Sequence, residues 1–270
     1  MILILTLRIF LTALSGADGP QRTAAIDSLV VLGDVERIGQ AVYKGGWRER
    51  NGLIDVLEKI GLQAVPVLVD VARNHPKVDG QRLAIRSLGY IGAVARDSLQ
   101  SLVKLQHRDL VAEALGRVGD KRDVAVVRAL LFDAHYDVRR RAALAFLNLA
   151  GDEAAQDLAM LLADAHHGVR FAAAEALVTL GDSGGQATLA YYEHLPVMGR
   201  FLALGVFGRL RYAPAQDLMK RALFSDDWSL RSSAVRALVV FDDARSVLEA
   251  LADKEKHPVV QTHIQQVLSD

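Results

Sequence analysis

Four of the eight histidines recur in a pattern that could support metal binding or contacts with a partner. His135 and His166 each stand four residues before an arginine, His167 adjoins the second, and His194 occurs in the next similar segment. Imidazole ligands of one ion need side chains within about 4 Å of one another, because each bond is about 2 Å long. Stacked helical turns stand about 10 Å apart. We therefore expect solvent-facing turn histidines, and the sequence predicts no metal site and no cofactor.

Other residue sets that commonly carry catalysis give no clear signal. The chain has no cysteine, which excludes thiol catalysis and disulfide bonds. It contains no HExxH zinc motif and no GxxxxGK[ST] phosphate loop. The sequence therefore indicates no catalytic residue, which favours a non-enzymatic role and leaves an enzymatic one open.

Composition restricts the kind of partner. Of the 270 residues, 51% are hydrophobic, which suffices for a sizeable core, and 32 basic residues balance 32 acidic ones. A protein that neutralises many phosphates needs a basic face. Nucleic acid is therefore not favoured, and it is kept as an alternative partner for the scattered arginines Arg82, Arg86, Arg140 and Arg236.

The clearest pattern is a basic or amide residue that returns about every 30 residues, as expected of a repeat architecture. The segments DVRRRAALAFLNLAGD at 137–152 and GVRFAAAEALVTLGD at 168–182 show it best. We call these residues the anchors; they are Arg22, Arg50, Gln81, Arg108, Arg139, Arg170, Arg200, Arg231 and Gln261.

Each anchor opens a stretch with helical periodicity. Counted from Arg170, apolar residues fall at Val169, Ala173, Leu177 and Leu180, which is the spacing of one buried stripe on a helix. A Gly-Asp pair then ends the helix and caps the next one. We therefore expect an all-α fold with two helices per repeat.

The predicted architecture is an α–α superhelix, a right-handed solenoid of about nine helix pairs that forms a single domain over residues 1–270. The expected repeats span approximately 1–33, 34–61, 62–92, 93–119, 120–151, 152–181, 182–211, 212–242 and 243–270.

The Val-Arg and Gly-Asp pattern resembles the HEAT-like repeats first recognised in phycobilisome (PBS) lyases, which are widespread in bacteria. The resemblance covers essentially the whole chain. It implies that the repeat arginines are structural, and that Arg139, Arg170 and Arg231 stack with turn aspartates between neighbouring repeats. The structural set is Arg22, Arg139, Arg170, Arg200 and Arg231.

The resemblance also implies an alternative function, that of a phycobilin-type chromophore lyase or lyase subunit. Such subunits tend to carry aromatic-rich segments in their first repeats, which this chain lacks. HEAT-like deoxyhypusine hydroxylases bind iron through His-Glu pairs, and no histidine here is followed by glutamate.

The apolar stretch Met1–Leu14 has two interpretations. We expect it to form the first helix of repeat one in a cytoplasmic protein, and its apolar side could support self-association. As an alternative, residues 1–17 could act as a signal sequence for export, with Ser15-Gly16-Ala17 as cleavage site. Arg8 interrupts the apolar run, which is too short to span a bilayer.

Solenoids bind partners on the concave surface that their second helices present. Positions +1, +5 and +8 from each anchor should be exposed there, and Gly205 and Gly208 should leave room beside Phe201. Polar residues such as Ser232 are expected near the end of the chain. The middle is apolar, which predicts a non-enzymatic protein-binding scaffold for a protein or peptide, unless tight curvature buries the patch. The predicted patch is Arg140, Leu144, Leu147, Phe171, Glu175, Val178 and Phe201.

Overall fold

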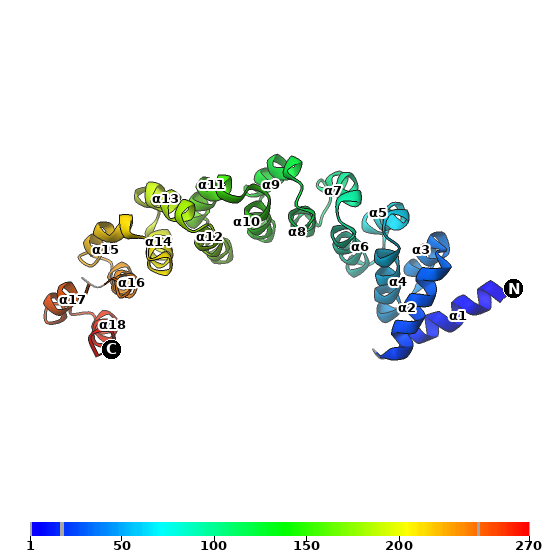
Figure 1. Ribbon diagram of the computed structural model, residues 1–270, viewed down its shortest axis with the longest axis horizontal. Coiled ribbons are helices and arrows are strands. Elements are labelled where there is room, and N and C mark those ends of the chain that lie inside the picture. The colour runs from blue at the N-terminus through cyan, green and yellow to red at the C-terminus, as the bar shows by residue number, and fades with distance from the viewer. Residues whose placement is uncertain (1, 17–18, 242–243, 270) are drawn as a thin grey trace. The chain divides into compact units, whose positions relative to one another are not determined.

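The computed structural model describes residues 2–16, 19–241 and 244–269, without the side chains of residues 2–8. In these ranges the regular structure consists of α-helices and short 3₁₀ turns (Figure 1). The chain forms two compact units, Met1–Asp133 and Ala134–Asp270, and each is described by itself. Met1 and Ala17, named in the possible signal sequence, lie outside the described residues.

Unit 1 contains consecutive helix pairs and the first helix of one more pair. Its helices are α1 (Ile2–Ser15), α2 (Pro20–Leu32), α3 (Val35–Lys44), α4 (Trp47–Ile60), α5 (Val65–Asn74), α6 (Val78–Ile91), α7 (Arg96–Leu102), α8 (Arg108–Val118) and α9 (Val124–Leu130). From α2 onward, each even-numbered helix packs against the next even-numbered one.

Unit 2 continues the same alternation. Its helices are α10 (Tyr136–Ala150), α11 (Ala155–Met160), α12 (His167–Thr179), α13 (Asp182–Tyr191), α14 (Val197–Leu210), α15 (Gln216–Ala222), α16 (Trp228–Leu238), α17 (Ala244–Ala252) and α18 (Pro258–Ser269). Even-numbered helices form one layer, which we call the second-helix layer, and odd-numbered helices form the first-helix layer (Figure 1). The predicted all-α architecture of HEAT-like helix pairs is confirmed; the single domain, the repeat boundaries and the handedness stay predictions.

The second helices are buried along the stripe that the sequence indicates. On α12, Val169, Ala173 and Leu177 are fully buried. Small residues at other places allow close approach between neighbouring helices. A Cβ built on Gly208 of α14 would lie 2.7 Å from the Cα of Ala237 on α16, so only glycine fits there.

A left-handed residue ends most of the second helices. Gly181, after α12, has a φ of +61°, and five other glycines at equivalent places also have positive φ. After α14 the same place is taken by Arg211, the only non-glycine residue with positive φ in the described ranges, at 49°. A side chain with a Cβ is strained in this conformation by about 1 kcal/mol.

Arg139 ties its own turn to that of the next helix pair. Its Nη1 donates to the carbonyl of Ala134, and its Nε and Nη2 donate to Asp164 at 2.7 and 2.9 Å. The backbone N–H of His166 donates to the same carboxylate at 2.8 Å. Burial alone would raise the pKa of Asp164, but these hydrogen bonds and the charge of Arg139 lower it below its ordinary 3.8.

Two other anchors make the same bidentate contact with the acidic residue of the next turn. Arg108 donates to Asp133 at 2.6 and 3.1 Å, and Arg231 donates to Glu255 at 2.8 and 3.0 Å. Paired charge-assisted hydrogen bonds of this kind fix both distance and orientation. They hold successive turns in register within each unit.

Arg170 and Arg200 contact backbone carbonyls instead. Nη1 of Arg170 donates to the carbonyls of Asp164 and Ala165, and within the described ranges its buried Nε has no partner. The next turn places His194 where the turns that follow Arg108, Arg139 and Arg231 carry a carboxylate, so Arg170 lacks the turn-to-turn pair implied by the resemblance. Arg200 donates to the carbonyls of Leu195 and Glu193. Arg22 likewise donates to the carbonyls of Leu14 and Arg48.

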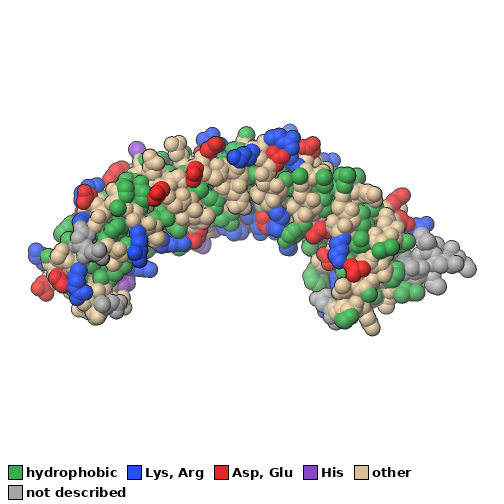
Figure 2. Space-filling model, viewed as in Figure 1, with side chains coloured by type: hydrophobic (Ala, Val, Ile, Leu, Met, Phe, Trp, Pro, Cys, Tyr) green, Lys and Arg blue, Asp and Glu red, His purple; other side chains and the backbone are tan. Residues whose placement is uncertain are grey.

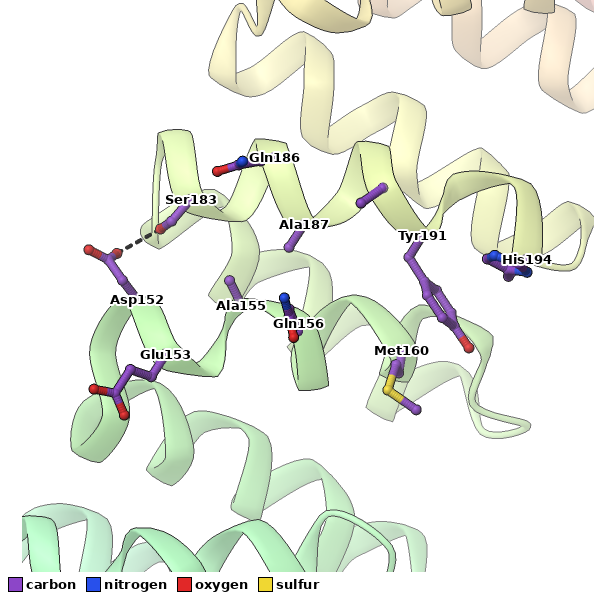
Figure 3. Close-up of a pocket in the computed structure, with 11 residues that line it drawn as sticks. Asp152, Glu153, Ala155, Gln156, Met160, Ser183, Gln186, Ala187, Tyr191 and His194 are labelled. Carbon is purple, nitrogen blue, oxygen red and sulfur yellow. Dashed lines mark hydrogen bonds between the residues drawn. The ribbon is translucent and has the colours of Figure 1, made fainter.

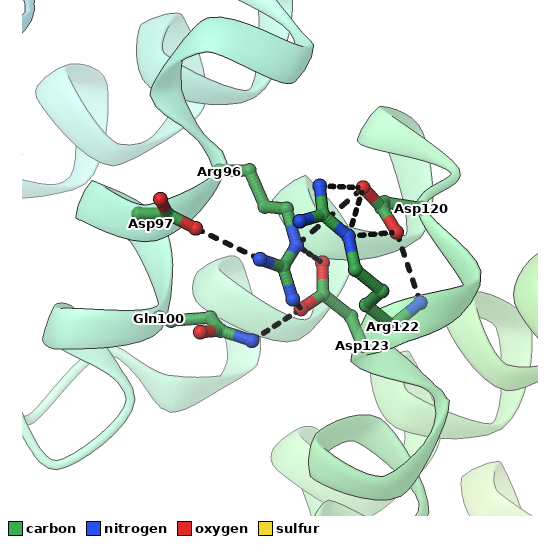
Figure 4. Close-up of polar contacts among 6 residues, drawn as sticks. All are labelled: Arg96, Asp97, Gln100, Asp120, Arg122 and Asp123. Atoms are coloured by element: carbon green, nitrogen blue, oxygen red, sulfur yellow. Dashed lines mark hydrogen bonds and ion pairs between the residues drawn. The ribbon is translucent and has the colours of Figure 1, made fainter.

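A buried ion pair joins the first-helix layer of unit 1. Arg96, at the start of α7, donates to both carboxylate oxygens of Asp123 at 3.2 and 2.8 Å, and Gln100 donates to the same carboxylate (Figure 4). Asp123 is fully buried. Nearby, hydrogen bonds from Arg122 lower the pKa of Asp120 to about 2. Because donors contact both oxygens of the buried Asp123, this carboxylate holds α7 to the turn before α9 and is not available to a substrate.

We predict that Arg211→Gly stabilises the protein by up to about 1 kcal/mol, because it removes the Cβ from a left-handed backbone position. The melting temperature should rise by about 2 °C. Arg211→Ala is the matched control, since it removes the same side chain but keeps the Cβ; an equal rise for both would show that relief of backbone strain is not the cause.

We predict that Asp164→Asn destabilises the protein by about 2 kcal/mol at pH 7, because Arg139 loses its charged acceptor. The folded pKa of Asp164 is lowered, so its contribution is complete above the ordinary 3.8 and is lost as the pH falls through the folded value. The difference in melting temperature between wild type and variant should therefore be smaller at pH 3 than at pH 7. The exposed Asp217→Asn is the control, and a difference that does not depend on pH would contradict the assignment.

Candidate functional site

The predicted patch lies on three adjacent helices of the second-helix layer of unit 2, namely α10, α12 and α14. Phe171 is 55% exposed and Leu144 is 41% exposed, and Glu175 is also exposed. Arg140, Leu147, Val178 and Phe201 are half-buried. The patch is therefore partly exposed and partly buried between neighbouring helices. Its apolar centre is formed by Phe171 and Leu144.

Arginines surround this apolar centre. Arg209 of α14 reaches across to α12, where its two terminal nitrogens donate to the two carboxylate oxygens of Glu175, the second at 2.9 Å. These hydrogen bonds lower the pKa of Glu175. Arg140 makes a 3.4 Å contact with Asp137. Arg236 of α16 is exposed and has no ion-pair partner among the residues that the structure describes.

The two glycines of α14 have different roles. A Cβ built on Gly205 would meet nothing within 4 Å, so this position leaves open space on α14, one turn before Arg209, which contacts Glu175. Gly208 is buried against α16, and the prediction that it leaves room beside Phe201 is wrong. Ser232 was also predicted on the exposed face, but it is only 5% exposed because it hydrogen-bonds to His263 of the next second helix.

The turn histidines take part in stacking. Tyr136 stacks on His166 with ring centroids 3.7 Å apart, and His166 accepts a hydrogen bond from the N–H of Gly168 at the start of α12. His135, His167 and His194 are exposed. Within the described ranges, no three histidine, aspartate or glutamate side chains are placed to hold a metal ion.

The tryptophans begin α4 and α16. Trp47 is 63% exposed and Trp228 is 45% exposed, with one face of Trp228 stacked on His257. Most of the Trp47 side chain therefore lies outside the core.

A groove of about 700 Å³ lies between α11 and α13 in the first-helix layer (Figure 3), and the sequence did not indicate it. Its floor is formed by Ala155 and Ala187, and its apolar end by Met160 and Tyr191. At the other end the hydroxyl of Ser183 donates to Asp152 at 2.6 Å. The groove exists because alanines occupy the facing sides of two short helices.

Residues 181–185 read Gly-Asp-Ser-Gly-Gly, which fits the GxSxG pattern of serine hydrolases. The catalytic pattern requires a strand-to-helix turn, whereas here the residues form the N-cap and first turn of α13, which follows the helix α12. His194 lies at the opposite end of the groove from Ser183, about 16 Å away along the helix axis (Figure 3). The groove therefore contains a serine, an aspartate and a histidine that do not form a catalytic triad.

Neither unit shows a field of one charge on the face seen in Figure 2, where acidic and basic side chains alternate with apolar ones. No helix in the described part of the chain has both the length and the apolar character needed to cross a bilayer. The signal-sequence and self-association hypotheses for the N-terminus stay predictions.

A family model for HEAT repeats matches residues 65–148 and 104–178. Together with the helix pairs that extend on both sides of these segments, this match identifies the chain as a HEAT-like repeat protein. The closer resemblance to phycobilisome lyases stays a prediction. No match was found among curated proteins.

Solved structures support the fold alone. The Escherichia coli protein YibA is 15% identical, with a TM-score of 0.52 over 94% of this chain and 99% of that one. The complex of CpcE and CpcF of phycocyanin lyase from Nostoc sp. PCC7120 is 17% identical, covering 97% and 93% of the two chains, with a TM-score of 0.40. An archaeal HEAT-like repeats protein from Thermococcus onnurineus is 15% identical, covering 87% and 96%, with a TM-score of 0.39.

We predict opposite effects for one substitution at two glycines of the same helix. Gly205→Ala should stabilise the protein by about 0.5–1 kcal/mol, because alanine is the better helix former and nothing obstructs its methyl group. Gly208→Ala should destabilise it by about 1–3 kcal/mol, because the methyl group would overlap Ala237. Urea denaturation measures both. Loss of stability at Gly205 would show that the space beside it is already occupied.

Proposed function

We propose that the chain is a non-enzymatic protein-binding scaffold and that α10, α12 and α14 dock an apolar segment of a partner protein. The observation that carries this proposal is the exposure of Phe171 and Leu144 on adjacent helices, together with the open space at Gly205 on the next helix of the layer. Exposed aromatic side chains that cluster on a rigid surface are typical anchors of protein interfaces.

The surroundings of Phe171 suit docking of one apolar side chain. Gly205 leaves a recess on the neighbouring helix, and the Glu175–Arg209 ion pair borders it. Arg140 borders Leu144 one turn earlier on α10. An apolar residue of the partner would therefore be surrounded by polar groups that keep water out at the rim.

In this proposal, the partner is bound through shape complementarity to a preformed surface. The bidentate contact between Arg139 and Asp164 fixes α10 and α12 relative to each other before a partner arrives. A surface that is already ordered loses little conformational entropy on binding. The alternatives, a chromophore lyase or a nucleic-acid-binding protein, stay predictions, since no described residue favours either.

The test is affinity capture from the native host, followed by measurement of the dissociation constant with the recovered partner. Phe171→Ser and Gly205→Leu should each weaken binding at least about tenfold, the first by removing the anchor and the second by filling the recess. Single substitution at Phe171 is preferable to a double change with Phe201, whose half-buried ring also supports the fold.

Phe224→Ser is the matched control, because Phe224 is 69% exposed and lies outside the patch, after α15. It should leave binding unchanged. The proposal fails if Phe171→Ser and Gly205→Leu bind the partner as wild type does while circular dichroism shows all three variants folded.

A further inference from the structure

The groove between α11 and α13 has different chemistry at its two ends. Asp152 and Glu153 lie at one end, and Met160 and Tyr191 lie at the other (Figure 3). Between them, Ala155 and Ala187 form an apolar floor, and the exposed Gln156 and Gln186 also line the groove. A volume of about 700 Å³ is within the range of about 300–1,000 Å³ found for ligand sites.

The acidic end has no compensating positive charge. Asp152 accepts a hydrogen bond from the neutral hydroxyl of Ser183, and in the described part of the chain neither Asp152 nor Glu153 forms an ion pair. Elsewhere on this unit the carboxylates of Asp164, Glu175 and Glu255 all meet arginines. The carboxylates of Asp152 and Glu153 can therefore bind a positively charged group of another molecule.

We propose that this groove docks a segment of a partner protein that carries a lysine or arginine and an apolar residue. The positive group meets Asp152 and Glu153, and its aliphatic stem lies over Ala155 and Ala187, as long basic side chains do on apolar surface. The apolar residue packs between Met160 and Tyr191. The two glutamine amides bind polar groups of the partner's backbone.

The dimensions favour a short two-point contact. α11 has six residues, from Ala155 to Met160, which corresponds to a length of about 9 Å. On a partner helix, residues one or two turns apart span about 5–11 Å. The basic and apolar residues of the partner are therefore one or two turns apart on the same helix face.

The test is selection of a displayed library of random peptides, about 16 residues long, with the whole chain as bait. Wild type should enrich a family that combines lysine or arginine with an apolar residue one or two turns away. The dissociation constant of the most enriched peptide of this family should rise at least about tenfold in Glu153→Lys and in Ala190→Phe. Ala190 is exposed at the groove, so a larger side chain there fills the groove without entering the core.

Two controls separate this groove from the patch on α10, α12 and α14. Asp217→Lys reverses an exposed carboxylate in the first turn of another first helix, and Phe171→Ser changes the patch. Neither residue lines the groove, so both variants should bind the peptide within about twofold of wild type. The proposal is overturned if no basic–apolar family is enriched, or if the enriched peptide binds Glu153→Lys and Ala190→Phe as tightly as wild type.

Discussion

Each helix pair of this chain can bury its apolar side only against the pairs next to it, so the lateral packing of second helices is the constraint on which the rest depends. Its closest points are glycine–alanine contacts at equivalent places of both units. A Cβ on Gly89 would lie 2.8 Å from the Cβ of Ala114, just as one on Gly208 would meet Ala237. In the second-helix layer, such contacts fix which side of a helix faces its neighbour and which side faces solvent.

That constraint explains how far the sequence could predict the binding face. The arginine period predicts the helix pairs and the buried stripe, because both follow from local periodicity. It places +1, +5 and +8 on the exposed side, yet +5 is the position that is most often open, as at Leu144 and Arg236. Position +8 approaches the next helix, which leaves Leu147 and Val178 half-buried and Gly208 buried. The width of a helix that its neighbour covers is a tertiary quantity that periodicity does not contain.

The groove between α11 and α13 was beyond prediction for a related reason. Its floor consists of alanines, and an alanine in a sequence indicates equally a buried packing residue and a surface one. The hydrolase-like pattern at 181–185 shows the same limit, because its chemistry depends on a strand before Ser183 and a histidine near it. The alanines and the hydrolase-like pattern can be interpreted only when the element packed beside them is known. In this structure that element is another helix.

The step from α12 to α14 and from α11 to α13 differs from the α10–α12 and α16–α18 steps of unit 2. Here the turn carries His194 where a carboxylate would complete the contact of Arg170, whereas Asp164 and Glu255 complete it for Arg139 and Arg231. At this step α14 also carries the bare Gly205, and α13 carries the alanines of the groove. The pair α13 and α14 therefore lacks a structural ion pair, and both of its helices have small residues where larger side chains could pack. Arg170 keeps only its hydrogen bonds to backbone carbonyls, so these losses reduce stability, and partners bound at the two proposed surfaces would supply interactions that balance them.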